Sequence, residues 1–283
     1  MSLVALLKKY WRRKKIDLVL TISGVLIVVL ISIMAITAPL IAPYNPYVSV
    51  DKALLPPSSN HPMGTDNLGR DIYSRVIYGS RIVLTVVLAS TLVSMVIGSI
   101  LGLVSGYFGG IIDRVMSVIM DSIYAFPGLI LAIAVAAMLG PGIINSVVSI
   151  SVVYIPTYFR MIRGHVLSVK SRLYVEAARA LGAPDLTIMT KYVLPNVVVT
   201  IPVIFSMNVA DAVLTEAALS FLGLGVPAPI PDWGFDLKNG QRNLLAGYWW
   251  PSIWPGVFII LLALGFSLLG EGLNELTGEG SRR

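Results

Sequence analysis

The sequence contains no cysteine, which excludes disulfide bonds, thiol nucleophiles and thiolate metal ligands. Charged residues are also scarce, at 13% of 283 residues, whereas about a quarter of an ordinary soluble domain is charged. Hydrophobic residues make up 56% of the chain, and its mean hydropathy is +0.82. This composition excludes a soluble protein and indicates one membrane-embedded helical bundle, an all-α fold.

Several kinds of site are missing as well. No G-x-x-x-x-G-K-[ST] phosphate loop occurs, so we expect this chain to bind neither ATP nor any other cofactor. His61 and His165 lie far apart and form no H-E-x-x-H pair, and we interpret them as solvated loop residues rather than metal ligands. The net charge is +6, yet the basic residues fall between apolar stretches, so we expect no nucleic-acid partner.

Six apolar stretches predict six transmembrane helices, because about 20 helical residues cross a hydrocarbon core of about 30 Å. Their residues are 18–42, 82–107, 115–139, 143–159, 193–221 and 254–269. The first is too long for a secretory signal peptide and is expected to remain as an anchor. Gly140-Pro141-Gly142 separates the third from the fourth. The second contains glycines at 98, 102 and 106, a spacing that lets another helix approach closely.

The distribution of Lys and Arg predicts the orientation. An even number of spans places both termini on one side, and the segments on that side contain 15 Lys and Arg residues against 6 on the other. We therefore expect both termini in the cytoplasm. The aromatic residues Tyr248, Trp249, Trp250 and Trp254 are expected at the outer interface.

These spans suggest four parts of the chain. Residues 1–17 form a basic cytoplasmic N-terminus, and 18–80 hold the first helix with an external loop. Residues 81–270 form a five-helix core, with a cytoplasmic loop at 160–195, and 271–283 form a cytoplasmic tail.

The cytoplasmic loop contains a predicted helix at 174–181. Its apolar residues Tyr174, Ala177, Ala178 and Leu181 have the i, i+3, i+4, i+7 spacing of one helical face. On the wetter side Glu176 can pair with Arg172 and Arg179. Gly182 permits a left-handed stop, and Pro184 with Asp185 favours a new helix start. The expected result is a helix, a sharp corner and a second helix.

These residues resemble the EAA-type loop of ATP-binding-cassette importer permeases, in Glu176-Ala177-Ala178, Gly182 and Leu194-Pro195. Three further stretches resemble the second permease subunit of dipeptide, oligopeptide and nickel importers. They are residues 61–71, Gly106-Tyr107-Phe108-Gly109-Gly110 followed by Asp113, and Leu139-Gly140-Pro141-Gly142. The resemblance covers residues 61 to 272 or so, and Tyr192 departs from it where the general pattern favours Ile.

The resemblance implies the type I importer permease fold and a transport subunit rather than an enzyme. It also implies a location in the plasma or inner membrane of a prokaryotic cell. Its expected partners are membrane lipid, a homologous second permease subunit, an external substrate-binding protein and two ATPase subunits that use ATP and Mg. The helix at 174–181 would dock on an ATPase. Substrates of such importers include dipeptides, oligopeptides, nickel and oligosaccharides. From spacing alone, an amphipathic helix lying on the inner lipid surface remains an alternative for this segment. Alternative functions are an intramembrane enzyme using acidic residues, a secondary carrier or a channel.

The external loop at 43–80 begins rich in proline and then becomes helix-like. Thr65 is expected to cap that helix, and Asp71 to brace it through Arg75. Thr65, Asp66, Gly69, Arg70 and Asp71 are its candidate functional residues. Two interpretations remain open: a surface helix near a binding protein, or a plug against the helix ends. The segment from Gly223 to Pro231 is expected to be non-helical, and buried or lining a cavity.

Three acidic residues within the spans are candidates for the substrate path: Asp211, Glu216 and Asp121. A carboxylate near the bilayer centre costs about 2.5 to 3.5 kcal/mol, so Asp211 should face the bundle interior, a water-filled path or a paired helix. Glu216 lies about 140° around the helix from Asp211, so the two should not point at one spot. We interpret Asp211 as a weak site for a substrate's amino group. The alternative is a structural partner for Asn208 or a sister subunit.

Overall fold

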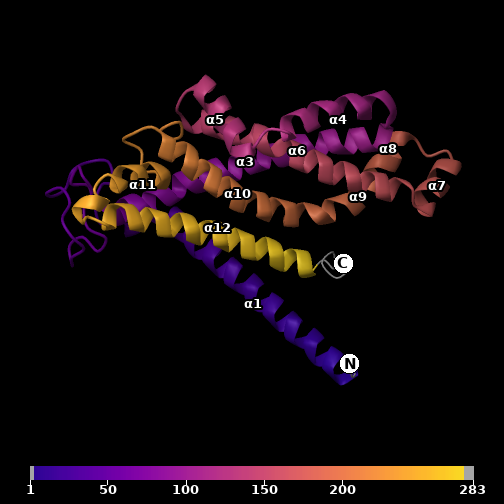
Figure 1. Ribbon diagram of the computed structural model, residues 1–283. Helices are drawn as coiled ribbons and strands as arrows, with labels where there is room; N and C mark the ends of the chain where they lie inside the picture. The colour runs from indigo at the N-terminus through magenta and orange to yellow at the C-terminus, as the bar shows by residue number, and fades with distance from the viewer. Residues whose placement is uncertain (1–2, 277–283) are drawn as a thin grey trace.

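The computed structural model describes the backbone of residues 3–276 and the side chains of residues 18–275, and its named elements are all helical (Figure 1). The long helices are α1 (Leu3–Ile36), α3 (Ile72–Phe108), α4 (Gly110–Tyr124), α5 (Gly128–Leu139), α6 (Ile143–Lys170), α10 (Ile201–Leu222) and α12 (Trp250–Leu276). The short helices are α2 (Ala38–Ile41), α7 (Leu173–Ala180), α8 (Asp185–Thr187), α9 (Leu194–Val197) and α11 (Trp233–Gln241). A π-helical segment (Ile188–Val193) and two 3-10 turns (Val198–Thr200 and Leu244–Ala246) complete the described part. Five helices are long and apolar enough to cross a membrane, or six if the bent pair α4–α5 counts as one span.

The glycines of α3 form its contact with α6, as their spacing predicts. A Cβ atom on Gly98 would lie 2.6 Å from the Ile155 carbonyl oxygen, and one on Gly102 would lie 2.6 Å from that of Phe159. One on Gly106 would lie 2.9 Å from Val166. Contacts that advance in the same direction along both helices show that α3 and α6 run parallel. The chain between them must therefore return across the bundle.

Helices α4 and α5 make that return, with a bend of 90° between them. The prediction of one straight helix over 115–139 is therefore wrong. Pro127 lies directly before α5, and a proline disfavours helical conformation at the residue before it and lacks the N–H that would continue the ladder. The next break is where it was expected, since Gly140 has φ +80° and α6 begins at Ile143.

Helix α12 packs antiparallel against α1 through small residues. A Cβ atom on Gly24 of α1 would lie 2.6 Å from the Leu269 backbone nitrogen, and one on Gly272 would lie 1.9 Å from the Thr21 hydroxyl. Helix α1 otherwise exposes apolar side chains such as Val19, Leu26 and Leu30. The exposed apolar side chains suit a helix surrounded by lipid, and the glycines allow α1 and α12 to pack closely together.

The bundle has two ends, which we name by the short helix at each (Figure 1). The α11 end carries residues 43–71 and α11, and the α7 end carries α7 and α8. The described beginning of α1 and end of α12 both lie toward the α7 end (Figure 1), as an even number of crossings requires. One apolar cluster fills the centre. A second, around Val166 and Ile188, lies at the α7 end, and a third around Trp250 lies at the α11 end.

Several predicted boundaries are wrong. Helix α3 begins at Ile72 and runs through the expected division at residue 80, so no separate surface helix precedes it. Helix α6 continues to Lys170, which places Arg160, Arg163 and His165 on a helix rather than in a loop. Helix α11 was not predicted, because its sequence has no apolar periodicity, although the preceding segment from Gly223 is non-helical as expected. Trp250 is buried in the third cluster rather than placed at a surface.

Candidate functional site

A hollow opens at the bend between α4 and α5, facing α6 and α10. Its volume is about 440 Å³, and it is lined by Ile123, Tyr124, Phe126, Gly128, Leu131, Val153, Tyr154, Thr157, Asn208 and Asp211. The bend that the sequence did not predict lies beside this space, because Tyr124 of α4 and Gly128 of α5, on either side of the bend, both line it. The lining combines apolar and aromatic walls with a few polar groups, which is the usual character of a small-molecule site.

Asp211 is the one acidic residue of this lining. Its side chain is exposed in the isolated chain and forms no ion pair with any described residue. The Tyr154 hydroxyl contacts both Asp211 and Thr215, with 3.1 Å between the Tyr154 and Thr215 oxygens. A carboxylate without a cation beside a hollow can attract a positively charged group.

The other two acidic candidates lie elsewhere. Asp121 is exposed and 3.6 Å from the Arg160 guanidinium. Glu216 is buried, with 1% of its surface exposed, and the Ser220 hydroxyl donates to it at 3.1 Å. The expectation that Asp211 and Glu216 point in different directions agrees with these positions.

The α7 end presents helix, corner and helix. Gly182 has φ +79°, the left-handed conformation expected at the corner, and Asp185 begins α8 directly after Pro184. Leu194 and Pro195 begin α9 nearby in the sequence. This arrangement follows from the glycine, because residues with a Cβ atom rarely adopt that backbone conformation.

The buried face of α7 differs from the predicted one. Val175 and Ala178 pack on the bundle, while Ala177 and Glu176 are exposed. Glu176 has no ion pair with Arg172 or Arg179, all three of which are described. Apolar residues occur on both sides of this helix, so periodicity alone could not choose the packed side. The exposed side chains of this segment include Leu173 (83%), Leu181 (88%) and Leu186 (67%).

Three polar interactions that the sequence did not reveal hold the α7 end together. The Tyr107 hydroxyl, at the end of α3, donates to the Asp185 carboxylate at 2.6 Å. The Lys170 ammonium group donates to the Tyr107 carbonyl oxygen. Asp113 of α4 accepts bonds from the Arg163 guanidinium at 2.5 and 2.6 Å. Tyr107 and Asp113 belong to the stretch 106–113, which is part of the family resemblance, and these bonds give both residues a structural role.

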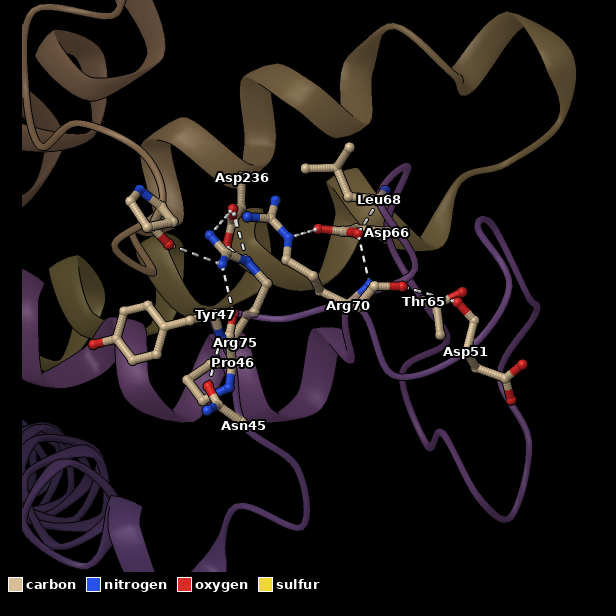
Figure 2. A network of polar contacts seen from close by, with 12 residues as sticks. Asn45, Pro46, Tyr47, Asp51, Thr65, Asp66, Leu68, Arg70, Arg75 and Asp236 are labelled. Atoms are coloured by element: carbon tan, nitrogen blue, oxygen red, sulfur yellow. Dashed lines mark hydrogen bonds and ion pairs between the residues drawn. The ribbon is translucent and has the colours of Figure 1, made fainter.

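At the α11 end, Arg75 joins three segments (Figure 2). Its guanidinium donates to Asp236 of α11, with a shortest distance of 2.6 Å, and to the carbonyl oxygens of Pro46 and Pro229 at 2.8 and 3.3 Å. The predicted brace between Asp71 and Arg75 is therefore wrong. Burial raises the pKa of Asp236, and the Arg75 guanidinium acts in the opposite direction.

The expected cap of α3 is also different. Asp71 is the N-cap, since it accepts a bond from the Ser74 backbone N–H at 2.7 Å. Thr65 instead accepts from the Leu55 N–H and donates to the Lys52 carbonyl oxygen, each at 2.8 Å. Asp66 binds Arg70 at 2.6 Å (Figure 2). Gly69 has φ +74°, and a Cβ atom there would lie 2.1 Å from the Asp51 carbonyl oxygen.

The two histidines are not solvated loop residues. His61 is 3% exposed, with its Nδ1 atom 2.9 Å from Asp71 and its Nε2 atom 3.5 Å from Asp51. His165 is half-buried, 3.3 Å from the Thr200 hydroxyl. No group of three or more potential metal ligands occurs among the described residues.

Comparison with known proteins places this architecture in a family. Residues 98–279 match the family described as binding-protein-dependent transport system inner membrane component. The chain is similar to the glutathione transport system permease protein GsiD of Pectobacterium atrosepticum, with 41% identity over 272 residues, 95% of this chain and 89% of the relative. GsiD of Shigella flexneri is 40% identical, and that of Escherichia coli O6:K15:H31 is 38% identical. Each of these two matches spans 271 residues, 94% of this chain and 88% of the relative.

These relatives are transport subunits and not enzymes, which confirms the expected class of function. A permease of this kind works with an ATPase and a binding protein. The chain belongs to the binding-protein-dependent transport system inner membrane component family, as a multi-pass permease subunit of an ATP-binding-cassette importer of the peptide and nickel type.

Proposed function

We propose that this chain forms half of the translocation pathway for small peptides, and that the Asp211 hollow receives the substrate's positively charged amino group. The other half comes from a homologous permease subunit. The observation that carries this proposal is the exposed Asp211 carboxylate in a hollow between the two ends of the bundle, without a cation partner in the described chain.

The comparisons support a peptide as substrate. The relatives at about 40% identity are named for glutathione, a small peptide with a free amino group. A hollow of about 440 Å³ is within the usual range for small-molecule sites. An acid placed there attracts the amino group and leaves the rest of the substrate to the aromatic and apolar walls.

The test compares Asp211→Asn with wild type in the reconstituted importer, using one peptide with a free amino end and the same peptide N-acetylated. Uptake of the free peptide should fall to the rate of the acetylated one, because the amide retains the size of the side chain but not its charge. Asp121→Asn is the matched control, since Asp121 lies outside the hollow beside Arg160. Equal uptake of the free peptide by wild type and Asp211→Asn would contradict the proposal.

We further propose that α7 and the Gly182 corner dock on the ATPase, which holds the ATP and Mg, and that the α7 end is cytoplasmic. A single importer would contain two such ATPase subunits. The support is a group of exposed leucines, Leu173, Leu181 and Leu186, beside the exposed Glu176 and Ala177. Exposed apolar side chains at the basic end of the bundle suit a protein partner better than water.

Leu181→Asp tests this docking. The substitution should reduce substrate-stimulated ATP hydrolysis and uptake together, while the permease itself stays folded, because Leu181 is 88% exposed. The control is Leu245→Asp, since Leu245 is 103% exposed but lies near the α11 end. Co-purification of the ATPase with each variant gives the measurement. A Leu181→Asp complex that retains its ATPase and its uptake would show that the contact lies elsewhere.

A further inference from the structure

Two buried carboxyl groups face one another at the α11 end. Glu216 lies on α10 with 1% of its surface exposed, and Asp232, the N-cap of α11, is fully buried. The two side chains are neighbours, at the point where the first turn of α11 packs on α10. Two ionised carboxylates in contact away from water would repel each other strongly.

The nearest cation is Arg75, which attracts Asp232 but is hydrogen-bonded to Asp236. The other buried arginine at this end, Arg70, is paired with Asp66. Neither Glu216 nor Asp232 forms an ion pair with a described residue. The two helices pack closely beside the pair, because a Cβ atom on Gly234 of α11 would lie 2.4 Å from the Ala217 carbonyl oxygen and 2.8 Å from the Ser220 Cβ atom. The first turn of α11 therefore lies directly on α10.

The hydrogen bonds leave one oxygen of each carboxyl group without a partner. Glu216 Oε1 accepts from the Ser220 hydroxyl, and Asp232 Oδ1 accepts from the Phe235 N–H at 2.9 Å. Glu216 Oε2 and Asp232 Oδ2 are buried and have no partner with a donor hydrogen. One proton on either carboxyl group turns an oxygen into a donor and makes a bond between the two groups.

The surroundings decide which group carries that proton. Asp232 accepts the Phe235 backbone N–H as the N-cap of α11, so it is placed as the acceptor of the pair. Glu216 has only the Ser220 hydroxyl and Asp232 beside it. Among the elements packed against α10, α3 carries Arg75 and α11 carries Asp236, and both charges act on Asp232. Helix α6 contributes Tyr154 beside Thr215, α5 has no titratable residue, and Glu271 and Glu275 occupy the last turns of α12.

We propose that Glu216 and Asp232 form a proton-binding site, in which a protonated Glu216 donates to ionised Asp232 and so holds α10 to the first turn of α11. This function goes beyond the import of any particular substrate. Loss of the proton as pH rises leaves two negative charges in contact, so it weakens the attachment of α11 to α10.

Infrared difference spectroscopy of the assembled importer tests the protonation directly. The wild-type complex at neutral pH should show the C=O band of a buried carboxylic acid, and Glu216→Gln should lose it. Glu271→Gln is the control, because Glu271 is an exposed acid of the same chain and should leave the band unchanged. Absence of the band from wild type, or its persistence in Glu216→Gln, would overturn the proposal.

Thermal unfolding of the same complexes between neutral and alkaline pH is the second measurement. The melting temperature of wild type should fall as pH rises, because the folded chain binds a proton that the unfolded chain releases. Glu216→Gln should fall less, since its amide donates to Asp232 without a proton to lose. Equal falls, or a wild-type stability that requires added Na⁺ or Ca²⁺ instead, would contradict a proton site.

Asp232→Asn keeps the measurement possible if Glu216→Gln does not assemble. Asparagine preserves the acceptor for the Phe235 N–H, which is the capping role. The C=O band of Glu216 should then shift, because its partner is no longer charged. A band at the wild-type position would show that Asp232 is not the acceptor.

Discussion

At the scale of single residues, the α11 end depends on buried charges that meet across long distances in the sequence. Arg75 is 1% exposed and its partner Asp236 lies 161 residues further along the chain. Such a pair specifies which segments meet, because a guanidinium with five donors fits a carboxylate and two carbonyl oxygens at once. The Arg75–Asp236 pair matters for stability mainly because removing one partner leaves the other charge buried and unpaired.

Arg75→Ala should therefore destabilise the permease by about 3 to 5 kcal/mol, since it leaves Asp236 buried without its cation. The measurement is the melting temperature of the purified complex. Arg81→Ala is the control, because Arg81 is an exposed residue of the same helix. An Arg75→Ala melting temperature equal to that of Arg81→Ala would mean that water, rather than Arg75, stabilises Asp236.

The residue-scale predictions failed where partners are remote. Spacing paired Asp71 with Arg75 and Glu176 with its neighbouring arginines, because helical spacing considers only residues three or four positions apart. In the structure Arg75 binds Asp236, 161 residues away, and Asp71 binds His61, ten residues away, in addition to its neighbour Ser74. Gly182 was predictable, since its requirement for positive φ is local.

At the scale of elements, the contact between α3 and α6 was half predictable. The glycines at 98, 102 and 106 predicted that another helix packs closely against α3, but their spacing did not identify α6 as that helix. Hydropathy likewise located the apolar stretch of α4 and α5 and missed its bend, because an average over many residues does not register the single Pro127. The partner of α3 and the bend between α4 and α5 were both missed because they depend on how helices pack against one another.

Gly102→Ala should weaken the α3–α6 contact, because the new Cβ atom would lie 2.6 Å from the Phe159 carbonyl oxygen and 3.1 Å from the Ile162 Cβ atom. Overpacking of this kind costs about 1 to 3 kcal/mol. Gly164→Ala on α6 is the matched control, since nothing lies within 4 Å of the position that its Cβ atom would take, and alanine favours a helix. Thermal unfolding should show a lower melting temperature for Gly102→Ala only. Similar temperatures for both would indicate that the two helices can separate freely.

At the scale of the whole molecule, the number of crossings agrees with the predicted topology when the bent pair α4–α5 counts as one span, and the described beginning of α1 and end of α12 lie toward the same end (Figure 1). The sidedness stays a prediction from the distribution of Lys and Arg, which does not depend on how the helices pack. Contacts between helices do not test the orientation in the membrane, since they are the same for either orientation.

The absence of native cysteine makes that orientation easy to measure. Arg172→Cys reports the α7 end, and Lys52→Cys reports the α11 end, both at exposed positions. In sealed cells, a membrane-impermeant maleimide should label the cysteine at 52 and spare the one at 172 until the cells are opened. Labelling at 172 but not at 52 in sealed cells would show that the orientation is opposite to the predicted one.

Helix α3 has a mechanical consequence. Its 37 residues form one uninterrupted rod without proline, about 55 Å long at 1.5 Å per residue. Arg75 fastens one end to α11, and Tyr107 fastens the other to Asp185 beside the Gly182 corner. Because this one helix is bonded to α11 at one end and to Asp185 of α8 at the other, we expect a displacement of α8 to be passed along α3 to α11.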